Sequence, residues 1–171
     1  MKYFNLFLIA LLTIAAGCFA QDTILLKRVP YKLTVPVDKN SSYEEQIKAT
    51  AYVLPDKSVQ LYPGETVYIE VEQENGIIKS VRAVKENKNP SITVIISFTQ
   101  MVNNKVNKLS MLKITNPFQN QLVYKARIFL LQQKRWIDTN VYPVGAELSG
   151  YETWPNIITS IWLGNWTFQS K

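Results

Sequence analysis

The chain has 171 residues, 19 basic against 13 acidic side chains, a net charge of +6 and no histidine. The lack of histidine excludes Ser-His-Asp and Cys-His catalysis, histidine-ligated zinc and a histidine general base. The two signs of charge are interspersed, which favours a solvated surface over nucleic-acid binding. We therefore expect no enzymatic activity, no metal, no cofactor and no nucleic-acid partner.

Residues 1–20 have the pattern of a secretory signal peptide. A single lysine precedes the almost wholly apolar run Tyr3 to Ala16, and Cys18-Phe19-Ala20 places small residues before a cleavage site at Gln21. The apolar run is short for a membrane span, which needs about 20 residues. We expect residues 21–171 to form one extracytoplasmic domain, periplasmic or secreted, with no transmembrane segment.

Cys18 offers a second processing route. Ala15-Ala16-Gly17-Cys18 resembles a bacterial lipobox, in which Cys18 would become the lipidated first residue of an anchored lipoprotein. Ala15 stands where a large aliphatic residue is usual, and the ending Phe-Ala-Gln resembles secreted proteins of the Bacteroidetes group, so we favour cleavage before Gln21. Cys18 is the only cysteine, and the mature domain therefore contains no disulfide.

The first elements after the signal are short. Thr23 to Leu33 is an apolar run interrupted by Pro30, which predicts an edge strand. Ser42-Tyr43-Glu44-Glu45 matches a capping box and predicts a short helix through Lys48. Ser58 to Tyr62 predicts a strand, and Tyr62-Pro63-Gly64-Glu65 places Pro and Gly in the positions of a type II turn.

The middle of the chain alternates between apolar and polar residues. Thr66 to Gln73 and Ile77 to Val84 predict two strands of a hairpin, because the intervening Asn75-Gly76 accepts positive φ at both positions. Ser91 to Met101 is apolar on both faces, as a central strand requires. Glu70, Glu72 and Glu74 share one face, which we interpret as solvated, with an oxygen-ligated calcium site as the alternative.

Lys108 to Leu131 predicts the most regular hairpin, with a turn at Asn116 to Asn120. The second strand has a period of two, so one face is expected to be buried and the other exposed. The expected buried face comprises Leu122, Tyr124, Ala126, Ile128 and Leu130, and the other face Gln121, Val123, Lys125, Arg127 and Phe129.

The last third continues in strands. Trp136 to Thr139 and Val141 to Val144 predict short strands, Gly145 to Pro155 an irregular loop, and Ile157 to Phe168 a closing strand. Turn signals recur about every 8–12 residues, which is typical of an all-β sandwich or barrel.

Two segments add a resemblance to this pattern. LYPGETVYIEV resembles the turn and second strand of many bacterial immunoglobulin-like domains, and LKITNPFQNQLVYKARI resembles paired strands of the same class. The resemblance covers Leu54 to Leu131 and concerns the fold alone. It implies an antiparallel immunoglobulin-like β-sandwich with extra terminal elements and at most one short helix.

Aromatic residues are concentrated towards the end of the chain, where all four tryptophans lie. Trp162 lies in a run that is apolar on both faces, so we expect it in the core. Trp154 precedes a proline within the expected loop, and loops on a rigid scaffold are where binding residues collect. The candidate ligand-binding residues are therefore Trp154, Tyr151, Trp136 and Tyr142.

Three functions follow from these features. The first is a non-enzymatic extracytoplasmic interaction domain that binds an envelope protein or glycan. The second is a carbohydrate-binding module that uses the C-terminal aromatics, and the third is a carboxylate-dependent glycosidase with Glu147 and Glu152 as the acids. The sequence leaves the ligand and the oligomeric state open.

The export route can be tested by the intact mass of the secreted product. We expect a mass that corresponds to a chain beginning at Gln21. A diacylglyceryl-modified Cys18 would establish the lipoprotein route instead, and retention of residues 1–20 would contradict both routes.

Overall fold

The computed structural model describes residues 25–169, which form β-strands in three antiparallel sheets. The strands are β1 (Tyr31–Pro36), β2 (Ser42–Ile47), β3 (Val59–Leu61), β4 (Glu65–Glu74), β5 (Ile77–Val84), β6 (Thr93–Asn103), β7 (Val106–Thr115), β8 (Gln121–Leu130), β9 (Arg135–Thr139), β10 (Ser149–Trp154) and β11 (Ile158–Gln169). The expected signal peptide and Cys18 lie outside the described residues.

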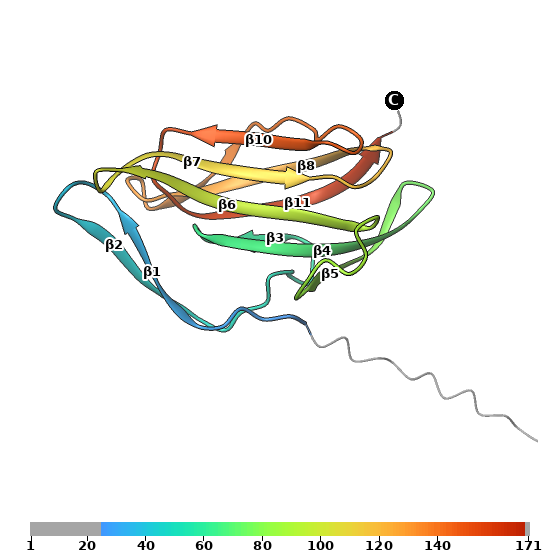
Figure 1. Cartoon of the computed structure of the whole chain (residues 1–171), viewed down its shortest axis with the longest axis horizontal. Helices are drawn as coiled ribbons and strands as arrows, with labels where there is room; N and C mark the ends of the chain where they lie inside the picture. The colour runs from blue at the N-terminus through green and yellow to red at the C-terminus, as the bar shows by residue number, and fades with distance from the viewer. Residues whose placement is uncertain (1–24, 170–171) are drawn as a thin grey trace, which may run out of the picture.

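Two of the sheets pack face to face as a β-sandwich, which confirms the expected fold class. A five-stranded sheet has the order β10-β7-β6-β4-β5, and a four-stranded sheet has the order β3-β11-β8-β9. In Figure 1 the five-stranded sheet lies in front of the four-stranded sheet. One apolar cluster joins their inner faces, with Ile96 and Leu112 from the first sheet and Ile128 and Ile161 from the second.

The alternation along β8 is confirmed. Tyr124 is 6% exposed and its neighbour Lys125 is exposed, so the two side chains lie on opposite faces of the strand. The buried face is the expected one, with Leu122, Tyr124, Ala126, Ile128 and Leu130.

The hairpin predicted for Lys108 to Leu131 has the right strands and the wrong pairing. β7 pairs with β6 and β10 in one sheet, whereas β8 pairs with β9 and β11 in the other. The residues between them therefore cross from one sheet to the other. The side chain of the buried Asn116 donates hydrogen bonds to the carbonyls of Asn120, Val144 and Gly145, which holds this crossover in place of a hairpin ladder.

Three local predictions are wrong. The helix predicted from Ser42 is strand β2, because pairing with β1 satisfies its backbone and buries Ile47. The loop predicted for Gly145 to Pro155 contains β10, which pairs along its length with β7. Val141 to Val144 forms no strand, and only Val144 makes an isolated bridge, to Leu122.

Two of the predicted turns are confirmed. Asn75 and Gly76 have φ values of 52° and 78°, and they join the paired strands β4 and β5. Gly64 has φ of 91° between Tyr62 and Glu65, whose backbone N–H donates to the Tyr62 carbonyl at 3.1 Å. Both glycines occupy the left-handed region that a side chain would disfavour.

The β1–β2 hairpin forms an arm outside the two large sheets (Figure 1). Its apolar side, Leu33, Val35 and Ile47, makes a second small core with Ile157 and the partly buried Tyr62. An isolated two-stranded hairpin is marginally stable in water, so this contact is needed to order the arm.

A buried ion pair fixes the base of the arm. The guanidinium of Arg28 is 2.8 Å from the Glu65 carboxylate, with side-chain exposures of 1% and 8%. The remaining N–H groups of Arg28 donate to Thr50, Ala51 and Gln60. The pair therefore connects the chain before the arm, the chain after it, β3 and the start of β4.

Aromatic rings enclose this ion pair. The guanidinium lies 4.4 Å from the ring centroid of Tyr52 and 5.2 Å from that of Tyr62. The Tyr31 hydroxyl donates to Glu65 at 3.2 Å. Burial, together with the adjacent Glu65 carboxylate, raises the pKa of Tyr31, so this hydroxyl keeps its proton and remains a donor.

Replacing Arg28 with Met should destabilise the domain strongly. The change leaves the Glu65 carboxylate buried without its cation, and breaking a buried pair costs about 3–5 kcal/mol. Lys32→Met is the matched control, because the Lys32–Glu44 pair is about half exposed and such pairs contribute about 0–1 kcal/mol. Urea unfolding of both variants measures the difference, and equal effects would contradict the role of the buried pair.

Candidate functional site

The four aromatic residues selected from the sequence lie along one side of the sandwich but do not converge. That side is formed by β10 and β9, which are the edge strands of the two sheets. Successive residues of a strand point to opposite faces. Tyr151 points outward from the five-stranded sheet, and Trp136 points outward from the four-stranded sheet.

Trp154 closes the gap between the two edges. Its side chain packs against the main core, and its indole Nε1 donates to the Thr139 hydroxyl of β9 at 3.0 Å. It lies at the end of β10, paired with the fully buried Ser110 of β7. This arrangement ties one sheet to the other, so Trp154 has a structural role.

Tyr142 and Tyr151 are the exposed members, with 80% and 57% of their surface accessible. The backbone N–H of Tyr142 donates to the Glu152 carboxylate at 2.6 Å. The Lys113 ammonium lies 5.6 Å from the centroid of the Tyr151 ring. Each of the two tyrosines therefore has its own local partner.

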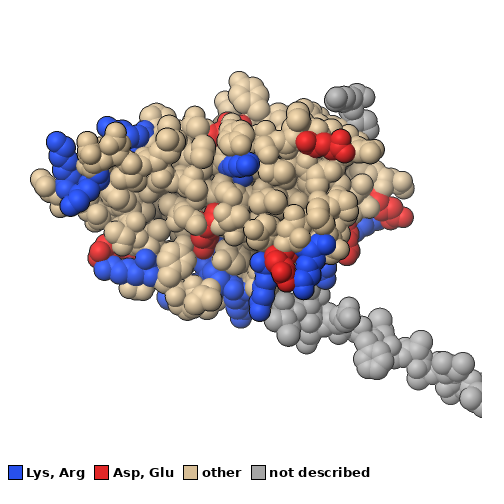
Figure 2. All heavy atoms as spheres, viewed as in Figure 1, with Lys and Arg blue, Asp and Glu red and all other residues tan. Residues whose placement is uncertain are grey.

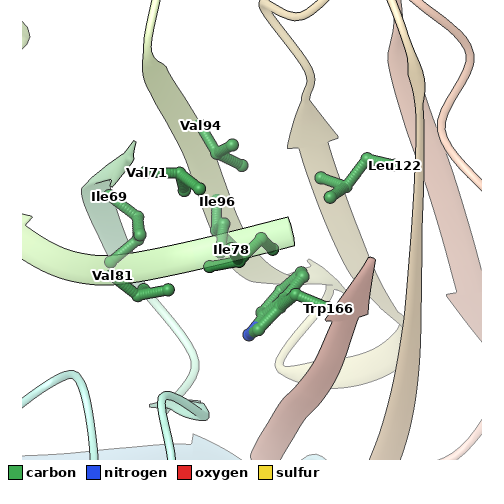
Figure 3. Close-up of a pocket in the computed structure, with 8 residues that line it drawn as sticks. All are labelled: Ile69, Val71, Ile78, Val81, Val94, Ile96, Leu122 and Trp166. Atoms are coloured by element: carbon green, nitrogen blue, oxygen red, sulfur yellow. The ribbon is translucent and has the colours of Figure 1, made fainter. Parts of the chain in front are cut away.

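Trp166 is also a structural residue. Its ring stacks on Tyr124 at 5.6 Å between centroids, and its Nε1 donates to the Lys57 carbonyl at 3.0 Å. It helps to line a cavity of about 10 Å³ between the sheets (Figure 3). The other walls are aliphatic, from Ile69, Val71, Ile78, Val81, Val94, Ile96 and Leu122, and a space of this size is near the limit for one water molecule.

The acidic residues have local partners. Glu70 is buried and accepts hydrogen bonds from Asn89 and Arg82, which hold the pKa of its carboxyl below the usual value. Glu72 accepts from the Ser80 hydroxyl, and Glu74 pairs with Lys79. No group of three or more acids, cysteines or histidines among residues 25–169 has the arrangement of a metal site.

An open groove with a volume of about 480 Å³ lies at the base of the arm. Val29, Tyr31, Tyr52 and Glu65 are among its walls. Because Glu65 is already bound by Arg28 and the Tyr31 hydroxyl, the polar group that could orient a ligand there is occupied.

A surface that the sequence reasoning missed lies on the outer face of the four-stranded sheet. The register of the four strands places Gln60, Trp162, Arg127 and Asp138 side by side in one row. The next row contains Ser160, Phe129 and Trp136. We call these residues of the two rows the platform.

Trp162 is the central residue of the platform. It is partly exposed, whereas Ile161 and Leu163 on either side of it are fully buried. The expectation that Trp162 lies in the core is therefore wrong. Residues 158–161 of β11 are all buried, but at Trp162 the strand alternates, so Ile161 and Leu163 point into the core and Trp162 points away from it.

A glycine lets the Trp162 ring lean along its strand. A Cβ at Gly164 would lie 2.5 Å from Cη2 and 2.6 Å from Cζ2 of Trp162. The indole thus covers the bare backbone of Gly164 instead of standing away from the sheet.

The rest of the platform is ordered by local contacts. Phe129 and Trp136 form an edge-to-face pair with centroids 5.6 Å apart. Arg127 and Asp138 are 3.4 Å apart from Nε to Oδ1, with side chains that are 49% and 92% exposed. Gln60 donates to the Ser160 hydroxyl at 2.9 Å.

The signal for this surface was present in the sequence. The same alternation that assigned Tyr124 to the core assigned Arg127 and Phe129 to the opposite face of β8. What the alternation could not supply was the pairing of β8 with β11 and β9, which places Trp162 and Trp136 beside them.

No protein-family model, curated protein or solved structure matches this chain. Within residues 25–169 the structure has no helix that could cross a membrane.

Trp154→Ala should destabilise the domain more than Trp162→Ala. The first change removes a side chain packed on the core and its hydrogen bond to Thr139, at a cost of about 3 kcal/mol. The second removes a partly exposed ring from an outer face, at a cost of about 1 kcal/mol. Chemical denaturation midpoints measure both, and a larger loss for Trp162→Ala would place its ring in the core.

Proposed function

We propose that the mature chain is a non-enzymatic extracytoplasmic interaction domain of immunoglobulin-like type, and that it binds its ligand through the platform. The observation that carries the proposal is the grouping of Trp162, Trp136, Phe129 and Arg127 on one sheet face. Tryptophan and arginine are among the residues that dominate binding energies at protein surfaces.

The other large face has a different character. The row through the middle of the five-stranded sheet contains Thr66, Ser97, Lys113 and Tyr151. In Figure 2 charged side chains are sparse over the middle of this face and gather towards its rim. This face offers no tryptophan or arginine in that row, which supports the platform as the binding surface.

Location outside the cytoplasm is proposed from the signal pattern of residues 1–20, with release before Gln21 favoured over anchoring through Cys18. The glycosidase alternative gains no support from the described acids. Glu152 already accepts a hydrogen bond from the Tyr142 backbone, and Glu147 is an exposed residue in a turn with φ of 57°.

Co-sedimentation of the purified mature chain with an envelope fraction from the source organism tests the proposal. We expect the wild type to sediment with this fraction, and Trp162→Ala/Trp136→Ala to bind at least about tenfold more weakly because both platform indoles are lost. Tyr142→Ala is the matched control, since it removes a more exposed aromatic that lies off the platform.

Thermal melts of the variants separate a binding defect from misfolding. Arg127→Gln provides a second platform variant, because this half-exposed side chain can be changed with little effect on the core. Failure of the wild type to bind, or equal binding by the platform variants and the control, would contradict the proposal.

A further inference from the structure

We infer that the ligand of the platform is an uncharged glycan, with a pyranose ring stacked on Trp162 and hydroxyls bound by Arg127 and Asp138. This inference rests on the proposed function, because it assigns a ligand class to the same surface. It differs from the residues first selected from the sequence, since Trp154, Tyr151 and Tyr142 take no part.

The length of the row favours an extended ligand. Gln60, Trp162, Arg127 and Asp138 come from four adjacent strands in register. Neighbouring strands lie about 4.8 Å apart, so the row is about 14 Å long. A sheet face of this length can accommodate an extended chain of sugar rings.

The position of the Trp162 indole on the outer face favours a ligand that can stack on it. The Trp162 ring lies over Gly164 on the outer face of the sheet and is partly exposed. The face of an aromatic ring carries partial negative charge, and it attracts the weakly positive C–H groups on one side of a pyranose. A ligand without such a C–H face would gain little from this geometry.

The polar pair Arg127 and Asp138 beside the indole favours a ligand with hydroxyl groups. Arg127 uses its Nε towards Asp138, and both side chains remain substantially exposed. The terminal N–H groups of the guanidinium can donate to one hydroxyl, while the carboxylate accepts from its neighbour. Vicinal hydroxyls of a sugar offer this combination of acceptor and donor.

Charge complementarity favours an uncharged glycan over an acidic one. The positive charge of Arg127 is compensated within the row by Asp138 at 3.4 Å. Lys125 pairs with Gly164 on the side of this row that is opposite to Phe129 and Trp136. Its positive charge, which no residue of the row compensates, therefore lies beside the row and not within it. An acidic polymer would meet the exposed Asp138 carboxylate directly.

A second contact point extends the site beyond one sugar. Trp136 lies two strands from Trp162 and one row along, and this offset corresponds to about 12 Å. The edge-to-face contact with Phe129 fixes its ring. A glycan running diagonally over the sheet would contact Trp162 first and Trp136 next.

Tryptophan fluorescence titration with defined oligosaccharides tests the ligand class. The probes are neutral hexasaccharides of β-1,4-linked glucose, mannose and xylose and of α-1,4-linked glucose, with hexagalacturonate as the acidic comparison. We expect at least one neutral probe to bind in the micromolar to millimolar range, with an affinity that is insensitive to salt because no net charge is neutralised.

The variants assign the binding to the platform. Trp162→Ala should weaken the binding of the neutral probe at least about tenfold, Trp162→Tyr should retain most of it, and Arg127→Gln should weaken it several-fold. Tyr142→Ala should leave it unchanged. Binding of hexagalacturonate alone, no neutral binding at millimolar concentration, or binding indifferent to Trp162→Ala would each overturn the inference.

Treatment of the envelope fraction separates this inference from the proposed function. Periodate cleaves vicinal diols and should abolish co-sedimentation, whereas protease should leave it intact. Platform-dependent binding that survives periodate and is lost with protease would overturn the glycan inference and leave the interaction domain standing. Absence of binding to the untreated fraction would overturn the proposed function itself.

Discussion

The buried ion pair between Arg28 and Glu65 is the constraint on which the arm and the sandwich jointly depend. Two ions removed from water are costly unless each finds several partners, and here the carboxylate also receives N–H and O–H donors from Tyr62 and Tyr31. The segments around Thr50, Gln60 and Glu65 must all lie in place for the full set of bonds to Arg28 to form. The ion pair therefore both stabilises the base of the arm and fixes how the arm is placed relative to β3 and β4.

The crossover at Asn116 shows how a polar side chain can decide topology. A turn sequence with Asn and Pro suits a hairpin, and the strands on either side alternate as hairpin strands do. The buried Asn116 amide donates to the carbonyl of Gly145 and adds a second donor to that of Val144, which also accepts from the Leu122 N–H. These partners lie about thirty residues away, so no local pattern could reveal that the chain changes sheet here.

The sequence predicted the elements that depend on local chemistry and missed those that depend on pairing. Period-two alternation identified β4, β5 and β8, and Asn75-Gly76 identified the turn between β4 and β5. Each of these signals is contained in a few neighbouring residues. β10 was missed because its ladder with β7 is supplied by a strand far away in the chain. The candidate site was likewise predicted in part. Composition identified the aromatic residues in the last third of the chain, but the register of the strands decides which of these residues share a face.

Register also explains why the candidate site moved from Trp154 to Trp162. Both residues belong to strands, and the inward or outward position of each ring follows from the strand that pairs with it. Trp154 is directed between two sheet edges, where closing the core uses its ring and its N–H. Trp162 is directed away from the core, and the missing side chain of Gly164 leaves the space that the Trp162 ring occupies. A tryptophan that closes the core has little surface left for a ligand, so we place the proposed binding surface on the outer sheet face around Trp162 and not at Trp154.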